Sequence, residues 1–219
     1  MSDHLLLEKR AILHAAIENA PFDGWGQQAL KRAARDAGYE EIMAARAFPE
    51  GSRDLLSFFL DETDREMIEG CEELDLAALK IRERIAAIIR LRLEQAIGRR
   101  EAVRRAISRL ALPGHGPLVA RHTAQTMDAI WRLAGDTATD FNWYTKRGLL
   151  AGVYTSTLLH WLNDDSEACH DTWAFLDRRI AEVMKIQKAK FKIQKRLAKL
   201  PTPWNTLGRL RHPKAQSTP

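Results

Sequence analysis

Apolar residues recur at spacings of three and four along most of the chain, which is the pattern of amphipathic helices. The first predicted helix covers about residues 4–19, with Leu6, Ile12, Leu13, Ala16 and Ile17 on one side. The same spacing, interrupted by glycine and proline, predicts further helices at about 27–37, 40–47, 52–70, 76–98, 99–111, 118–134, 140–162 and 166–199. A turn is expected at Pro21–Gly24, a rigid loop at Pro113–Pro117, and a loose tail at 201–219, which holds four prolines.

The composition supports an all-α fold. The chain holds 31 alanines and 27 leucines but only four valines. Alanine and leucine are strong helix formers, whereas β-branched residues favour strands. A β-sandwich, a barrel or a parallel α/β fold is therefore not expected.

The charge of the chain is unevenly distributed. The net charge is +5, yet residues 178–219 hold 12 basic residues and a single acid, Glu182. The remainder of the chain is consequently acidic. A basic end predicts an anionic partner such as nucleic acid, lipid headgroups or an acidic protein face. We divide the chain into a head (1–49), a helical domain (50–184) and a basic C-terminal part (185–219).

The N-terminal third resembles the helix-turn-helix head of TetR-type repressors. It combines Gly24-Trp25, Leu30 with Ala33-Ala34, Gly38 and Phe48-Pro49. Such a head can place its second helix in the major groove, where basic and amide side chains read the bases. Here that helix opens with Glu40 and Glu41 and holds one arginine, Arg46. Carboxylates repel phosphates, so we expect a head kept for folding and no DNA binding. The alternative is a TetR-type DNA-binding transcriptional regulator with a small-molecule pocket.

The segment from Asp140 to Leu159 has the most specific pattern. Asp140, Trp143, Tyr144 and Arg147 follow an i, i+3, i+4, i+7 spacing, which places them on one helix face. That face is either core or a partner surface. Gly148, Gly152 and Ser156 form a small-residue stripe, which allows close helix packing or leaves a groove for an apolar ligand.

The run 140–165, together with Asp171-Thr172-Trp173-Ala174-Phe175-Leu176 and Arg179-Ile180, resembles the coenzyme Q biosynthesis protein nine family. The resemblance implies a non-enzymatic, TetR-like homodimer that binds an isoprenoid lipid of ubiquinone biosynthesis. It implies that the quinone precursor is presented to a di-iron demethoxyubiquinone hydroxylase. The family's partner face corresponds to Asp140, Trp143, Tyr144 and Arg147. A lipid cavity is expected around Gly148, Gly152, Ser156 and Leu159, with no cofactor beyond the lipid ligand.

The last predicted helix changes its apolar face near residue 185. Beyond it, lysines lie beside a second apolar face, a pattern typical of helices on anionic membranes. The expected membrane-binding residues are Lys185, Lys188, Phe191, Lys192, Ile193, Lys195, Leu197 and Trp204. Docking on an acidic protein partner and nucleic-acid binding remain alternatives. We expect the protein to lie on the cytoplasmic side of a bacterial inner membrane, or on the matrix side of the mitochondrial inner membrane.

The sequence offers little that predicts catalysis. Cys71 and Cys169 form no disulfide framework, and no phosphate-binding glycine loop or nucleophile elbow occurs. Glu167 and His170 form a single Glu-x-x-His, whereas a di-iron bundle needs two such pairs and two further glutamates. We therefore expect neither a metal site nor an enzyme.

Overall fold

A computed structural model of the chain describes residues 3–136 and 141–197, with the side chains of residues 3–136 and 144–185. Throughout these ranges the regular structure is helical, so the all-α prediction is confirmed. The chain divides into two compact units, Met1–Asp177 and Arg178–Pro219. We call them the body and the C-terminal segment.

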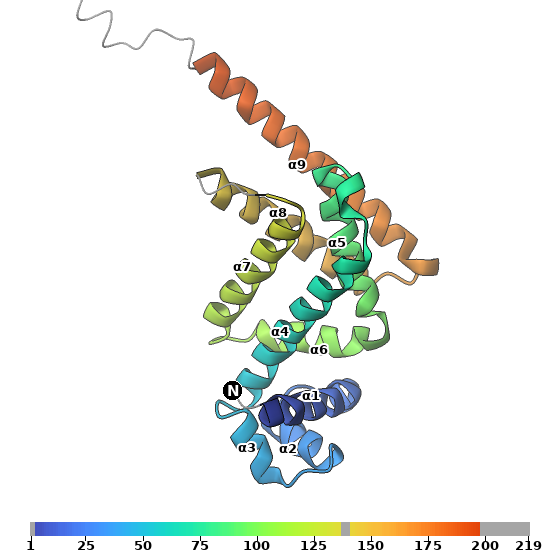
Figure 1. Cartoon of the computed structure of the whole chain (residues 1–219), viewed down its shortest axis with the longest axis vertical. Helices are drawn as coiled ribbons and strands as arrows, with labels where there is room; N and C mark the ends of the chain where they lie inside the picture. Colours follow the sequence, from blue (N-terminus) through green and yellow to red (C-terminus); the bar gives the residue numbers. More distant parts are fainter. Residues whose placement is uncertain (1–2, 137–140, 198–219) are drawn as a thin grey trace, which may run out of the picture. The chain divides into compact units, whose positions relative to one another are not determined.

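The first three helices form the head of the body. They are α1 (Asp3–Asp23), α2 (Gln27–Asp36) and α3 (Glu41–Ala47), and they gather at one end of α4 (Ser52–Gly70) (Figure 1). Small buried residues such as Ala16, Ala33 and Ala34 allow α1 and α2 to pack closely. Trp25 fixes the head to the rest of the body, because its indole N–H donates to the Ala102 carbonyl at 3.0 Å.

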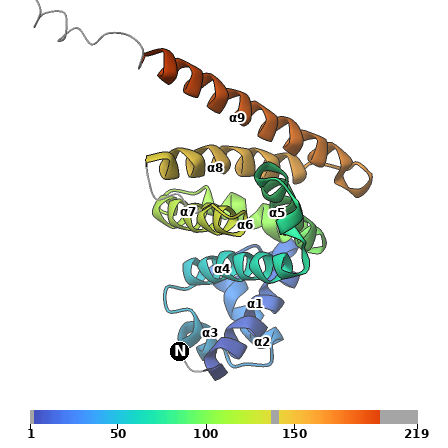
Figure 2. The same cartoon turned by 45° about the horizontal axis from the view of Figure 1, so that its top comes forward.

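The remaining helices of the body stack in layers beyond the head. They are α5 (Ile81–Gln95), α6 (Arg100–Leu110), α7 (Gly116–Leu133) and α8 (Phe141–Trp161). Helix α4 contacts α5 and α7, and α7 in turn contacts α8. Figure 2 shows this order, with α4 next to the head, α6 and α7 beyond it, and α8 after them. Helix α9 (His170–Leu197) begins in the body and continues into the C-terminal segment.

Three predicted boundaries are wrong. Helix α1 runs through Pro21 to Asp23, and the chain turns only at Gly24, whose φ is +66°. Pro21 has no N–H and so removes one hydrogen bond of the helix. Because it lies in the last turn of α1, few other hydrogen bonds follow it and the helix is not interrupted.

The starts of α5 and α9 also lie later than the sequence predicts. The Asp75 carboxylate accepts a hydrogen bond from the Ala78 N–H, which closes a 3₁₀ turn (Leu76–Ala78) ahead of α5. Before α9, Ala168 and Cys169 both have positive φ. This left-handed backbone separates the 3₁₀ turn Glu167–Cys169 from the helix that begins at His170.

Candidate functional site

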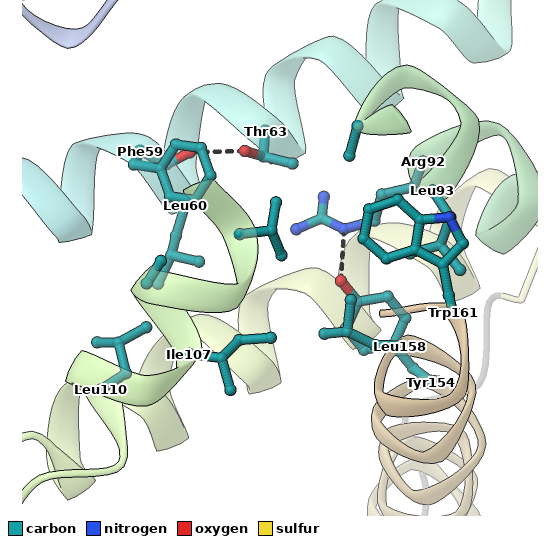
Figure 3. A pocket seen from close by; sticks show the side chains of 13 residues that line it. Phe59, Leu60, Thr63, Arg92, Leu93, Ile107, Leu110, Tyr154, Leu158 and Trp161 are labelled. Carbon is teal, nitrogen blue, oxygen red and sulfur yellow. Dashed lines mark hydrogen bonds between the residues drawn. The ribbon is translucent and has the colours of Figure 1, made fainter. Parts of the chain in front are cut away.

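A hollow lies among four helices of the body. Figure 3 shows the side chains that surround it, and they are predominantly apolar. They are Phe59, Leu60 and Thr63 of α4; Arg92 and Leu93 of α5; Ala96; Val103, Ala106, Ile107 and Leu110 of α6; and Tyr154, Leu158 and Trp161 of α8. The enclosed space is small, about 60 Å³, and the hollow is partly open to solvent. An apolar hollow with few polar groups is the usual form of a small-molecule site.

The main polar group of the hollow is Arg92, which is only 4 % exposed. Its Nε donates to the Tyr154 hydroxyl at 2.9 Å, as the dashed line in Figure 3 marks. Its Nη1 lies 2.5 Å from Asp64 Oδ1, and the Thr126 hydroxyl is 2.9 Å from the other Asp64 oxygen. Arg92 therefore joins the apolar hollow to a polar network between α4, α5, α7 and α8.

Arg92 keeps its charge inside this apolar environment. Burial alone would lower the pKa of Arg92, but Tyr154 and Asp64 raise it above its usual value. Removing a guanidinium from water is costly, and pairing it with a carboxylate only partly compensates. A buried ion pair beside an apolar hollow is thus an expensive feature that marks a candidate binding site.

The sequence reasoning missed Arg92 and Tyr154. A signal for Arg92 is nevertheless present, because it continues the apolar face formed by Ile85, Ile88 and Ile89. An arginine at a position where the helical period requires a core residue is unusual, since arginines are rarely buried without a partner. Tyr154, by contrast, lies 62 residues away and carries no such signal.

The residues expected to hold the lipid lie on another face of α8. Gly148 and Gly152 are exposed, and apart from the adjoining backbone of α8 itself no atom of the described residues would come within 4 Å of a Cβ at either position. Leu159 is 49 % exposed, while Ser156 is half-buried and donates to the Gly152 carbonyl. We call Gly148, Gly152, Ser156 and Leu159 the α8 stripe. The structure brings these residues together, but on the body's surface and away from the hollow.

The residues of the expected partner face differ in how deeply they are buried. Tyr144 is 72 % exposed, whereas Arg147 is buried and donates from Nε and Nη2 to Asp128 Oδ1 at 2.9 and 2.5 Å. Burial raises the pKa of Asp128, but hydrogen bonds from Arg147 and Arg132 outweigh this and lower it. Arg147 thus fastens α8 to α7 beneath Tyr144. Trp143 belongs to α8 with its side chain outside the described residues, and Asp140 lies outside them altogether.

The expected membrane-binding residues lie mostly outside the described part. Lys185 is exposed on α9. Lys188, Phe191, Lys192, Ile193, Lys195 and Leu197 belong to α9 without described side chains, and Trp204 lies beyond it. No helix in residues 3–136 and 141–197 is long and apolar enough to span a membrane.

In the head, acidic residues pair with the basic ones. Glu41, at the start of α3, contacts Arg35 at 3.0 Å and Lys31 at 3.6 Å. Arg32 in turn contacts Asp23 at 3.1 Å. Basic side chains of α2 that could reach DNA phosphates therefore have carboxylate partners in their own head.

The described side chains include no group of three or more His, Cys, Asp or Glu residues placed to hold a metal ion. Glu167 lies in the 3₁₀ turn before α9, and His170 begins that helix with its side chain 83 % exposed. His122, by contrast, is buried, and its Nε2 lies 2.9 Å from the Ser57 hydroxyl, which ties α7 to α4.

Comparisons with known proteins give both a family and a fold. Residues 116–187 match the family described as COQ9. The mitochondrial ubiquinone biosynthesis protein COQ9 of Rattus norvegicus is 35 % identical over 79 % of this chain, and that of Homo sapiens is 34 % identical over 79 %. This chain spans 57 % and 56 % of those two proteins. A TetR transcriptional regulator from Nitrosomonas europaea, 23 % identical, has a TM-score of 0.65 and covers 80 % of this chain and 96 % of its own.

Proposed function

Because the chain belongs to the COQ9 family of ubiquinone biosynthesis proteins, we propose that it is a non-enzymatic accessory protein that binds an isoprenoid lipid. In this proposal it presents a quinone precursor to a di-iron hydroxylase that acts on demethoxyubiquinone. The TetR-like fold provides a helical body that can enclose such a ligand.

The observation that carries the proposal is the hollow among α4, α5, α6 and α8. Its walls include Leu60, Ile107 and Leu158, which are side chains suited to an isoprenoid tail. Burying such a tail gains about 25 cal/mol for each Å² of apolar surface removed from water. We place the lipid in this hollow, with its tail continuing out through the open part.

Tyr144 and its neighbours on α8 form the proposed docking face for the hydroxylase. An exposed aromatic side chain on a firmly held helix is typical of an interface hot spot. Arg147 supports this role from below, because its pairing with Asp128 keeps the start of α8 against α7. We include Asp140 and Trp143 in the face on the basis of the family resemblance.

The α8 stripe is the proposed contact for a second copy of the chain. Glycines at positions 148 and 152 allow another backbone to approach closely. In such a homodimer the stripe is covered, and Leu159 is removed from water. Any contribution of the stripe to lipid binding depends on this second copy.

The C-terminal segment is the proposed membrane-binding element. Its lysines fit the inner face of an anionic membrane, where each adds about 1 kcal/mol. The protein then resides on the cytoplasmic side of a bacterial inner membrane or on the matrix side in mitochondria. DNA binding is not part of the proposal, because Glu41 pairs with both Lys31 and Arg35 in the head.

The delivery role is tested with Tyr144→Lys in cells that depend on this protein. Ubiquinone is expected to fall at least several-fold and the demethoxy precursor to accumulate, because a lysine disrupts an apolar contact at the docking face. Both are measured by mass spectrometry of lipid extracts.

The matched control is Phe22→Lys, which changes an aromatic residue that is 88 % exposed in the head. That variant is expected to retain normal ubiquinone. Normal ubiquinone in the Tyr144→Lys strain, with equal protein levels, would refute the docking face.

A further inference from the structure

The guanidinium of Arg92 is directed into the hollow and is only partly satisfied. Figure 3 shows it between the side chains of α4 and α8, in the middle of the space that the apolar residues surround. Nε has the Tyr154 hydroxyl as its acceptor, and Nη1 has Asp64. Among the described residues, Nη2 has no hydrogen-bond partner.

The Tyr154 hydroxyl leaves a second donor at the same place. Its oxygen accepts from Arg92 Nε, and its own proton has no acceptor among the described residues. A hydrogen bond from a charged donor such as Arg92 contributes about 1.5–3 kcal/mol, so a ligand oxygen at this place is stabilised. Arg92 Nη2 and the Tyr154 hydroxyl therefore offer two donors to whatever occupies the hollow, while the Thr63 hydroxyl donates its proton to the Phe59 carbonyl at 2.7 Å.

The charge of the site indicates which kind of oxygen fits. Asp64 already balances the Arg92 cation at 2.5 Å, and the Thr126 hydroxyl at 2.9 Å stabilises that carboxylate. The network as a whole is close to neutral. An additional carboxylate or phosphate in this apolar space would bring a charge without a counter-ion, which is costly. A neutral oxygen that only accepts hydrogen bonds, such as a carbonyl, fits both donors without that cost.

We infer that the hollow recognises an apolar molecule through a neutral carbonyl-type oxygen that binds Arg92 Nη2 and the Tyr154 hydroxyl. The oxygen-bearing end of the ligand then lies in the hollow, and the hydrocarbon chain extends toward the opening. This inference rests on the proposed lipid-binding function and adds the residues that select the ligand's head. In the absence of ligand, water fills the same role for the two donors.

Titration calorimetry with three short ligands tests this inference on the whole chain. The ligands are geranyl-1,4-benzoquinone, geranylbenzene, which lacks the oxygens, and 4-geranylbenzoic acid, which is an anion at pH 7. The wild-type protein is expected to bind the quinone roughly 10- to 100-fold more tightly than the hydrocarbon, as a hydrogen bond from a charged donor provides. The benzoate is expected to bind more weakly than the quinone.

Two substitutions test whether the two donors cause the preference for the quinone over geranylbenzene. Arg92→Lys keeps a cation for Asp64 but removes the planar group that reaches the hollow, so the quinone should bind no better than geranylbenzene. Tyr154→Phe leaves the Arg92–Asp64 pair in place and should reduce the preference by roughly three- to tenfold. If Arg92→Lys does not fold, as judged by circular dichroism, the preference of Tyr154→Phe for the quinone alone tests the inference.

The matched control is Arg90→Lys, on the same helix, where the Arg90 side chain is 53 % exposed and pairs with Glu94. It should keep the wild-type preference. Equal binding of the quinone and the hydrocarbon by the wild type, or tighter binding of the benzoate, would overturn the inference while leaving the lipid-binding function intact. Failure of all three ligands to bind the wild type would instead count against the lipid-binding function itself.

Discussion

Tyr144 and Arg147 are neighbours on α8 with opposite physical roles. Tyr144 is 72 % exposed and can contact a partner, whereas Arg147 is 7 % exposed and donates hydrogen bonds to Asp128. The spacing of the two residues correctly places them on a common part of the helix. It cannot indicate that one side chain points outward and the other folds back toward α7.

Arg147→Met is expected to destabilise the protein by about 2–4 kcal/mol, because it leaves the Asp128 carboxylate without its main partner in a partly buried place. The control Tyr144→Ala should change stability by no more than about 0.5 kcal/mol, as exposed substitutions usually do. Urea unfolding followed by circular dichroism measures both. A stable Arg147→Met protein would show that Arg147 does not fasten α8.

Asp164 is a second residue whose role is evident only in the folded chain. Its carboxylate accepts hydrogen bonds from the backbone N–H groups of Ser166 and Thr172, each at 2.8 Å, and from the Thr172 hydroxyl at 2.5 Å. Burial raises the pKa of Asp164, but these hydrogen bonds outweigh it and hold that pKa well below its usual range. The carboxylate thereby organises the first turn of α9.

Asp164→Asn should cost about 1–3 kcal/mol at pH 7, because an amide replaces a charged acceptor of three hydrogen bonds. Since the pKa is lowered in the folded state, the stabilisation is complete above the unfolded pKa of about 3.9 and is lost as the pH falls further. The difference from the wild type should therefore be equal at pH 7 and pH 5.5 and smaller at pH 3. Urea unfolding at the three pH values measures it.

The control for this prediction is Asp165→Asn, which changes the adjacent exposed carboxylate. It should have little effect at any pH. An equal loss of stability in both variants, or a difference at Asp164 that does not depend on pH, would contradict the role assigned to the Asp164 carboxylate.

Among the helices, the predictable features are those that depend on local pattern. The periodicity locates α2, α3 and α4 to within a residue or two, because glycine and proline mark their ends. It misses the late start of α5, which depends on a hydrogen bond that the Ala78 N–H donates to the Asp75 carboxylate. It also misses the left-handed backbone at Ala168 and Cys169, since neither residue favours that conformation.

The candidate site was less predictable than the helices, because it depends on contacts between distant segments. The pattern on α8 predicts a lipid site at the glycine face, whereas the hollow is lined by Tyr154, Leu158 and Trp161 on another face. Nothing in a single helix shows which of its two faces will meet α4, α5 and α6. The pairing of Arg92 with Tyr154 and Asp64 follows only once the helices are packed.

In the molecule as a whole, charge separates the body from the C-terminal segment. The net charge of +5 combines an acidic body with a segment that holds 12 basic residues and one acid. The ligand-binding and membrane-binding roles that we propose therefore belong to different units of the chain.

Replacing Lys185, Lys188, Lys192 and Lys195 by glutamate should abolish binding to vesicles that contain anionic lipid. The change removes about 1 kcal/mol of attraction for each lysine and adds repulsion. The matched control replaces the same four lysines by arginine, which keeps the charge and should retain binding. Co-sedimentation with phosphatidylglycerol vesicles measures both, and undiminished binding of the glutamate variant would refute the membrane role.

The lipid that co-purifies with the whole protein, identified by mass spectrometry, decides whether the hollow holds an isoprenoid ligand. We expect an isoprenoid quinone or quinone precursor with the wild type, and at least a tenfold reduction in Ile107→Trp, whose indole occupies the hollow. Leu7→Trp, at a position in the head that is 64 % exposed, should retain the lipid. The absence of any isoprenoid lipid from the wild type, or its undiminished retention by Ile107→Trp, would contradict the proposed lipid-binding role.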